Sequence, residues 1–175
     1  MLLNLDEFRK INDSLGHAAG DKLIKAMVAR LKTVIRSNDT MARVGGDEFA
    51  LIMLGSCQHK DVELVAKKLL AAVQRPFQIE GHNLYISASL GAAIYPEHGD
   101  TPAALLGRTE VAMVSAKALG KNQWRIYSQQ IDSDGKAELS MVADMREGIR
   151  NGELLLHYQP IFCVETGELK GAAAL

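Results

Sequence analysis

Apolar residues follow two different rhythms along the first 127 residues of the chain. Three segments repeat them every three or four positions, which is the spacing of one buried helical face. These helical segments cover residues 24–35, 61–73 and 102–119. Short apolar runs typical of strands lie at residues 1–5, 40–44, 49–54, 77–79, 83–95 and 124–127. Strands and helices in this order favour an α+β fold, with a mostly antiparallel central sheet flanked by helices.

Turn and cap residues mark the ends of several of these elements. Residues 6–20 are rich in turn-forming residues, so the stretch is predicted as an irregular connection before the first helix. Thr101 and Pro102 form an N-cap and a first helical position. Glu80 and Gly81 predict a tight turn between two strands.

The composition is that of a globular chain with nearly balanced charge. Of its 175 residues, 47% are hydrophobic and 23% are charged, and 20 Lys and Arg stand against 21 Asp and Glu. This balance lacks the basic footprint of DNA or RNA binding, so no nucleic-acid partner is predicted. No apolar run approaches the roughly 20 residues of a membrane span, so no membrane contact is predicted for this chain.

The cysteines and the first residues bear on the cellular setting. Cys57 and Cys163 lie far apart, have no metal-ligand spacing beside them and are too few for a disulfide framework. A reducing, cytoplasmic location fits this pattern. The chain starts directly in a strand-like run, which suggests that it was cut from a longer protein, and membrane attachment of that parent stays open.

A change of composition predicts a domain boundary. Residues 128–135 are mainly Ser, Gln, Asp and Gly, which indicates a polar linker. A further amphipathic helix is predicted over residues 137–151 and a strand over residues 154–161. We therefore predict one domain over residues 1–127, the linker, and the beginning of a second domain over residues 136–175.

The sequence Gly-Gly-Asp-Glu separates two of the predicted strands and reads as a hairpin tip. Gly45 and Gly46 permit positive φ and let a bulky anion approach the backbone N–H groups, so phosphate is the natural ligand. Asp47 and Glu48 would repel phosphate unless a divalent cation lay between them, which predicts a Mg²⁺–phosphate site. The alternative is an ordinary solvated turn.

Four motifs in order resemble the GGDEF family of diguanylate cyclases. They are NLDEFRKINDSLGHAAGD at residues 4–21, RVGGDEF at 43–49, SLG at 89–91 and AKALGKN at 116–122. The resemblance covers residues 1–127 and implies a nucleotidyl-cyclase-like fold with a ferredoxin-like core. It also implies that the family's usual N-terminal segment is missing from this chain.

The resemblance implies specific site residues. Asp47 and Glu48 match the catalytic carboxylates and metal ligands, together with the backbone carbonyl of Leu5 and with Asn4, where the family usually has Asp. The positions that match GTP-binding residues are Phe8, Asn12, Asp21, Gly45, Gly46, Lys117 and Lys121. Alternative interpretations are a turn residue for Asn12, a helix N-cap for Asp21 and an exposed i, i+4 pair for the two lysines.

The implied activity is condensation of two GTP molecules into cyclic di-GMP with release of pyrophosphate, using Mg²⁺ or Mn²⁺. One such site holds one GTP, so a homodimer is implied for catalysis. Because Asn4 replaces a carboxylate, an alternative is a weak or degenerate domain that binds GTP or cyclic di-GMP and regulates a neighbouring EAL domain in bacterial signalling. A third possibility is a scaffold that dimerises without binding nucleotide.

Two further patterns match the same family of signalling proteins. Arg36 and Asp39 lie at the end of the first predicted helix, and five residues, 40–44, separate Asp39 from the hairpin tip. This spacing matches the family's RxxD inhibitory site for cyclic di-GMP; a helix-end Arg and a turn Asp are the alternative. The tail from residue 154 resembles the start of an EAL phosphodiesterase domain, which implies a piece of a GGDEF–EAL tandem protein. Ala173 stands where that family has its metal-binding Glu.

Overall fold

The computed structural model describes residues 1–55, 58–153 and 155–174. Its contacts divide the chain into two compact units, Met1–Ser133 and Asp134–Leu175. Cys57 and the first residue of the strand predicted from residue 154 lie outside the described residues. Among the described helices, none combines the length and the apolar character needed to cross a membrane.

The first unit is built on a five-stranded sheet with the order β2-β3-β1-β6-β7. Its strands are β1 (Leu2–Leu5), β2 (Thr40–Arg43), β3 (Glu48–Ile52), β6 (Ala88–Ala92) and β7 (Trp124–Ile126). All neighbours pair antiparallel except β6 and β7, which are parallel. Every residue of β1 and β6 is buried, because both central strands are covered on both faces. The predicted α+β fold with a mostly antiparallel sheet is confirmed.

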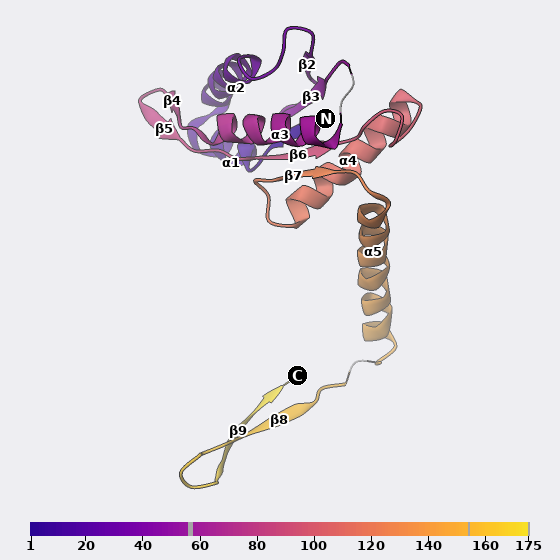
Figure 1. The fold of residues 1–175 in the computed structure, drawn as a ribbon. Helices are drawn as coiled ribbons and strands as arrows, with labels where there is room; N and C mark the ends of the chain where they lie inside the picture. Colours follow the sequence, from indigo (N-terminus) through magenta and orange to yellow (C-terminus); the bar gives the residue numbers. More distant parts are fainter. Residues whose placement is uncertain (56–57, 154, 175) are drawn as a thin grey trace. The chain divides into compact units, whose positions relative to one another are not determined.

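Helices cover this sheet on both sides (Figure 1). They are α1 (Phe8–Leu15), α2 (His17–Lys32), α3 (His59–Gln74) and α4 (Pro102–Ala118). The main core joins α2 and α3 to the sheet through fully buried side chains such as Leu23, Met27 and Val73. The α4 helix packs on β6, β7 and β1 with the small residues Ala112 and Ala116.

The segment from residue 6 to residue 20 is helical, which corrects the prediction of an irregular connection. The α1 helix occupies Phe8–Leu15, and α2 begins at His17, well before residue 24. Gly16, at φ 82°, separates the two helices. Only Phe8 is fully buried in α1, so the short helix lacks the long apolar stripe that would have revealed it.

The single strand predicted over residues 83–95 is also wrong, because it is two strands in different sheets. The β5 strand (His82–Leu84) folds back on β4 (Phe77–Ile79), and β6 begins at Ala88 in the main sheet. Glu80 and Gly81 both have positive φ, 52° and 81°, so the predicted tight turn is present. The apolar pattern continues between β5 and β6, and the spacing of apolar residues does not show where one strand ends and a strand of another sheet begins.

The start of α4 follows the sequence prediction closely. Thr101 is the N-cap, its Oγ1 accepts a hydrogen bond from Ala104 N at 3.2 Å, and Pro102 is the first helical residue. Beyond the end of the helix, Gly120 has φ 112°, as expected of a helix stop. Cap and stop residues act on neighbouring backbone groups, so the sequence alone predicts these helix ends.

The predicted linker over residues 128–135 is helical from residue 129. The α5 helix (Gln129–Arg150) begins eight residues before the predicted start at 137, and Ser128 Oγ accepts a hydrogen bond from Ile131 N at 3.4 Å at its N-terminus. In the second unit, β8 (Tyr158–Phe162) and β9 (Leu169–Ala174) form an antiparallel hairpin. The assignment of residues 136–175 to a second domain stays a prediction.

Candidate functional site

One arginine stabilises the tip of the β2–β3 hairpin through hydrogen bonds to its backbone. Arg43 Nε donates to the carbonyls of Gly45 and Gly46, each at 3.1 Å, and its Nη2 donates to Gly46 at 2.6 Å. Neither glycine has positive φ, so that part of the prediction is wrong. What the glycines supply is space: a Cβ on Gly46 would meet nothing within 4 Å. The tip is therefore an ordered loop with an open face.

The end of β1 lies directly beside this tip. Leu5 N donates to Asp47 O at 3.0 Å, and Asn4 is paired with Glu48 across the sheet. Asn4 is only 5% exposed, and its Nδ2 donates to Glu48 Oε1 at 3.1 Å. The structure thus brings together all four residues of the predicted metal site, although residues 4 and 47 are far apart in the chain.

The donor set at this edge fits one hard divalent cation. Asp47 and Glu48 are half-buried carboxylates, and the Leu5 backbone supplies a carbonyl nearby; oxygen donors of this kind suit Mg²⁺ and Mn²⁺. Asn4 does not fit as a further ligand in the observed arrangement, because it turns its amide nitrogen towards Glu48. A cation held here would therefore rely on the other three residues.

Asp6, to which sequence reasoning assigned no role, organises the site. It is 6% exposed and accepts hydrogen bonds from Ser87 Oγ at 2.6 Å and Ser89 Oγ at 2.7 Å. A third bond comes from Asn122 N at 3.1 Å. Asp6 therefore ties the end of β1 both to β6 and to the loop that follows α4. The Asp two residues after Asn4 was visible in the sequence, but its partners lie more than 80 residues away.

The same loop delivers Lys121 to the site. Lys121 has φ 61° and lies beyond the end of α4, so it is not part of a helical i, i+4 pair with Lys117. Its Nζ lies 2.9 Å from Glu7 Oε1, across 114 residues of sequence. Lys117 lies in the last turn of α4 and takes no part in this ion pair. One of the two predicted phosphate-binding lysines is thus placed at the end of β1.

Glu7 holds two lysines at once at this point. Its second oxygen, Oε2, lies 2.8 Å from Lys10 Nζ. The hydrogen bonds from Lys10 and then Lys121 hold the pKa of the exposed Glu7 carboxyl well below its usual range, and the Glu7 contact raises the pKa of Lys121. Two cationic side chains are therefore gathered around one carboxylate, in a place that an anionic ligand can reach.

The corner between α1 and α2 carries the predicted guanine-binding residues. Asn12 lies inside α1 and Asp21 inside α2, so they are neither a turn residue nor an N-cap. Asn12 Oδ1 is buried and has no hydrogen-bond partner among the described residues. It packs against Gly20, where a Cβ would overlap it, and the buried Phe8 lies on the same side. Asp21 is exposed at the rim of this corner.

Arg36 and Asp39 lie in the connection between α2 and β2. Asp39 Oδ2 accepts a hydrogen bond from Arg36 N at 3.0 Å, and its Oδ1 accepts one from Leu54 N at 3.4 Å. The α2 helix ends at Lys32, so Arg36 does not cap its last turn. Within the described part of the chain, the exposed guanidinium of Arg36 makes no hydrogen bond or ion pair.

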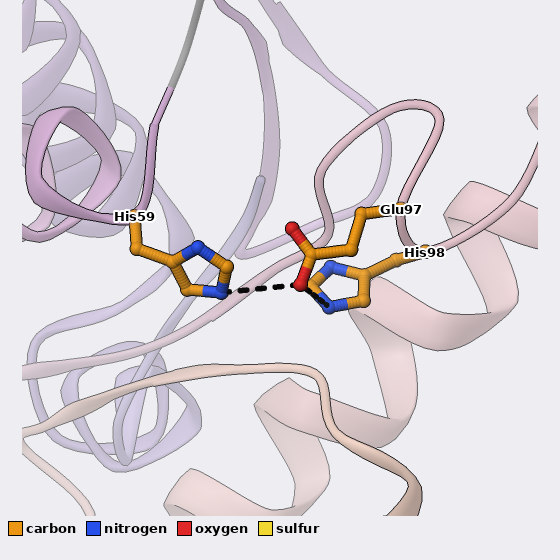
Figure 2. A group of neighbouring side chains, drawn as sticks. All are labelled: His59, Glu97 and His98. Atoms are coloured by element: carbon orange, nitrogen blue, oxygen red, sulfur yellow. Dashed lines mark ion pairs between the residues drawn. The ribbon is translucent and has the colours of Figure 1, made fainter.

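Away from this site, three side chains meet between the start of α3 and the loop before α4 (Figure 2). Glu97 Oε1 lies 3.5 Å from Nε2 of both His59 and His98, and the three ligand atoms could surround a metal ion. However, His98 Nδ1 accepts a hydrogen bond from Ile94 N at 3.0 Å. The neutral ring therefore carries its proton on Nε2, the atom that a metal would need.

Burial lowers the pKa of His98, which favours this neutral form. Since Nε2–H then faces Glu97, a metal ion would have to displace this proton, and we interpret the cluster as a structural group of one hydrogen bond and two polar contacts at 3.5 Å. Its role is to join the N-terminus of α3 to the loop that leads into α4.

Comparison with known proteins agrees with the fold and shows the family. Residues 1–123 match the family model described as diguanylate cyclase, GGDEF domain. Over 175 residues the chain is 35% identical to the cyclic di-GMP phosphodiesterase NbdA and 34% identical to the bifunctional diguanylate cyclase/cyclic di-GMP phosphodiesterase MucR, both of Pseudomonas aeruginosa. All of this chain is covered, but only 22% of NbdA and 25% of MucR, so it spans about a quarter of the length of these relatives.

A solved structure shows the same architecture. The GGDEF domain of TpbB (YfiN) from Pseudomonas aeruginosa is 38% identical in sequence and superimposes with a TM-score of 0.70. The match covers 73% of this chain and 80% of that chain. The likeness therefore extends over most of the first unit.

Proposed function

The chain belongs to the GGDEF family of diguanylate cyclase domains, and on that premise we propose that it binds GTP at the end of β1. In this proposal two copies face each other, each with one GTP and a divalent cation, and condense the two nucleotides into cyclic di-GMP. Each 3′-hydroxyl attacks the α-phosphate of the other GTP, and pyrophosphate leaves. Positioning and charge neutralisation supply most of the catalysis in such phosphoryl transfers.

The observation that carries this proposal is the meeting of three distant segments at one edge of the sheet. The Leu5–Asp47 hydrogen bond brings the hairpin tip to β1, and the Asp6–Asn122 hydrogen bond brings the loop with Lys121 to the same end. Carboxylates, a lysine and an open glycine loop are the groups that a metal-bound triphosphate requires. Local turn chemistry alone would not assemble them.

Each group has a role in the proposal. Asp47, Glu48 and the Leu5 carbonyl would hold Mg²⁺ or Mn²⁺, which neutralises phosphate charge when bound. Lys121 would exchange Glu7 for phosphate oxygens, with Lys117 contributing charge from the end of α4. The chain's own residues thus orient the triphosphate against the hairpin tip, where Gly45 and Gly46 admit it.

The base would lie in the corner between α1 and α2. Asn12 Oδ1, a buried acceptor without a partner among the described residues, can accept from a guanine N–H, and Asp21 can accept from the same edge. Satisfying a buried orphan acceptor makes guanine binding favourable. Phe8 closes the phosphate end of this corner as a buried apolar wall.

We expect Asn12→Ala and Asp21→Ala each to weaken GTP binding at least about tenfold, since each removes hydrogen bonds to the base. Titration calorimetry with GTP in the presence of Mg²⁺ measures the affinity. Asp13→Ala is the matched control, because Asp13 is exposed next to Asn12 on α1 and its ion pair among the described residues is with Arg9 at 3.7 Å. Equal GTP affinity in all four proteins would remove the proposed guanine site.

Product formation tests the reaction itself. The chain is incubated with GTP and Mg²⁺, and cyclic di-GMP is sought by chromatography. If GTP binds but no product forms, the result supports the second candidate function: a GTP-binding module that regulates a neighbouring domain. The neutral Asn4 beside Glu48 is the observation that favours this candidate. If GTP does not bind either, both functions are wrong.

We also propose that Arg36 and Asp39 bind cyclic di-GMP as an inhibitory site. The exposed Arg36 fork is available to guanine or phosphate, and Asp39 is held in place by two backbone N–H groups. We expect Arg36→Ala to weaken cyclic di-GMP binding at least about tenfold while GTP binding is kept. Lys32→Ala removes an equal charge at the end of α2, four residues earlier in the chain, and should change little. Unchanged binding in Arg36→Ala would contradict the site.

The second unit is assigned only by its sequence pattern. We propose that residues 136–175 are the first piece of an EAL-type domain, which needs on the order of 250 residues to close its barrel. Such a piece cannot hydrolyse cyclic di-GMP by itself, and Ala173 offers no metal ligand.

A further inference from the structure

The buried Asn4 and the half-buried Glu48 form a pair at the centre of the site. They are directly opposite each other in the register of β1 and β3, where facing Cβ atoms come within about 5.5 Å. Asn4 is 5% exposed, and its Nδ2 donates to Glu48 Oε1 at 3.1 Å. The carboxylate is therefore stabilised by a neutral donor from the same sheet.

A carboxylate at position 4 would create a different situation. Two like charges would then face each other in a poorly solvated place, which is unfavourable unless a cation lies between them or one group takes up a proton. An amide removes this requirement, because it donates a hydrogen bond and carries no charge.

We propose that Asn4 is a positioning residue that takes the place of a bridging divalent cation for Glu48. The Asn4–Glu48 hydrogen bond thereby orders the Glu48 side chain, and the fold of this chain does not depend on Mg²⁺ or Mn²⁺. Asn4 engages Glu48 Oε1, which leaves Glu48 Oε2, Asp47 and the Leu5 carbonyl as the donors for the cation that accompanies GTP. The last point rests on the proposed function, whereas the cation independence of the fold does not.

The test measures thermal unfolding without nucleotide, in EDTA and in millimolar Mn²⁺. The wild-type Tm should be the same in both, to within about 1 °C. Asn4→Asp should lower the Tm in EDTA by about 4 °C or more at neutral pH, a shift typical of one unfavourable buried interaction in a domain of this size. Mn²⁺ should restore most of that loss.

Two further variants separate charge repulsion from other effects. Asn4→Asp combined with Glu48→Gln restores one amide and one carboxylate, so its Tm in EDTA should return towards wild type and its Mn²⁺ response should disappear. Asn38→Asp adds the same charge at an exposed position and should show neither effect. A wild-type Tm that rises with Mn²⁺ as in Asn4→Asp, or an Asn4→Asp protein as stable as wild type in EDTA, would overturn the proposal.

Calorimetry then connects the pair to nucleotide binding. GTP affinity should fall in both proteins when Mg²⁺ is replaced by EDTA, because Asp47 and Glu48 then face the triphosphate without a cation, and the fall should be at least about threefold larger in Asn4→Asp, which adds a further carboxylate. A protein that shows the Tm pattern but no GTP binding would contradict the proposed function and leave the role of Asn4 intact. Equal Mg²⁺ dependence in both proteins would contradict the nucleotide part.

Discussion

Replacing Asp6 with alanine is expected to lower the free energy of unfolding by about 3 kcal/mol, because three hydrogen-bond donors lose a charged acceptor at once. The donors are the hydroxyls of Ser87 and Ser89 and the backbone N–H of Asn122. Ser89 is fully buried, so water does not replace the lost partner without a rearrangement of the sheet.

Urea unfolding followed by circular dichroism measures this loss. Asp13→Ala is the control, since an exposed carboxylate paired only with Arg9 should contribute less than about 0.5 kcal/mol. A second effect is expected on ligand binding, because the loop that carries Lys121 is anchored through Asn122 to Asp6. If Asp6→Ala is as stable as Asp13→Ala, the hydrogen bonds described here do not hold the site together.

Replacing Gly91 with alanine should be equally damaging for a steric reason. A Cβ at this position of β6 would overlap the backbone of α4, at Thr109 O and Met113 N. Backbone atoms in a packed helix cannot move aside as a flexible side chain can, so α4 would have to shift away from the sheet. We expect a loss of about 3 kcal/mol, at the upper end of overpacking effects.

Gly107 provides a matched control on the same helix. A Cβ on Gly107 would meet nothing within 4 Å, and the residue lies in the exposed middle of α4. Gly107→Ala should therefore raise the free energy of unfolding by about 0.5–1 kcal/mol, the gain from glycine to alanine inside a helix. Unfolding of both variants in urea compares them directly. A Gly91→Ala protein as stable as wild type would show that α4 does not approach β6 this closely.

The sequence alone was sufficient for elements whose signals are local. The Thr101-Pro102 start of α4, the Glu80-Gly81 turn and the hairpin around Gly45 and Gly46 were all predicted, because caps and turns depend on neighbouring residues. The order of four motifs also indicated the family, which the match over residues 1–123 confirms. Caps, turns and sequence motifs each consist of neighbouring residues, so they can be identified without knowing which distant residues are in contact.

Two predicted elements differ from the structure, because the local sequence pattern in each case is compatible with more than one secondary structure. The sequence of residues 6–20 predicts a connection because Asn12 and Gly16 favour turns, and the eight residues of the α1 helix bury only Phe8. The apolar run over residues 83–95 predicts one strand, whereas β5 and β6 pair in different sheets. In both cases packing against a distant element decided the structure.

Only the tertiary structure decided how the site residues meet. Asp6 accepts hydrogen bonds from Ser87, Ser89 and Asn122. Lys121 pairs with Glu7, which lies 114 residues away in the sequence. The Asn4–Glu48 hydrogen bond likewise depends on the register between β1 and β3, which no stretch of sequence contains. The sequence determined which groups are present. Their pairing is non-local, because a buried charge or amide takes whichever partner the sheet and the loops bring within hydrogen-bond distance.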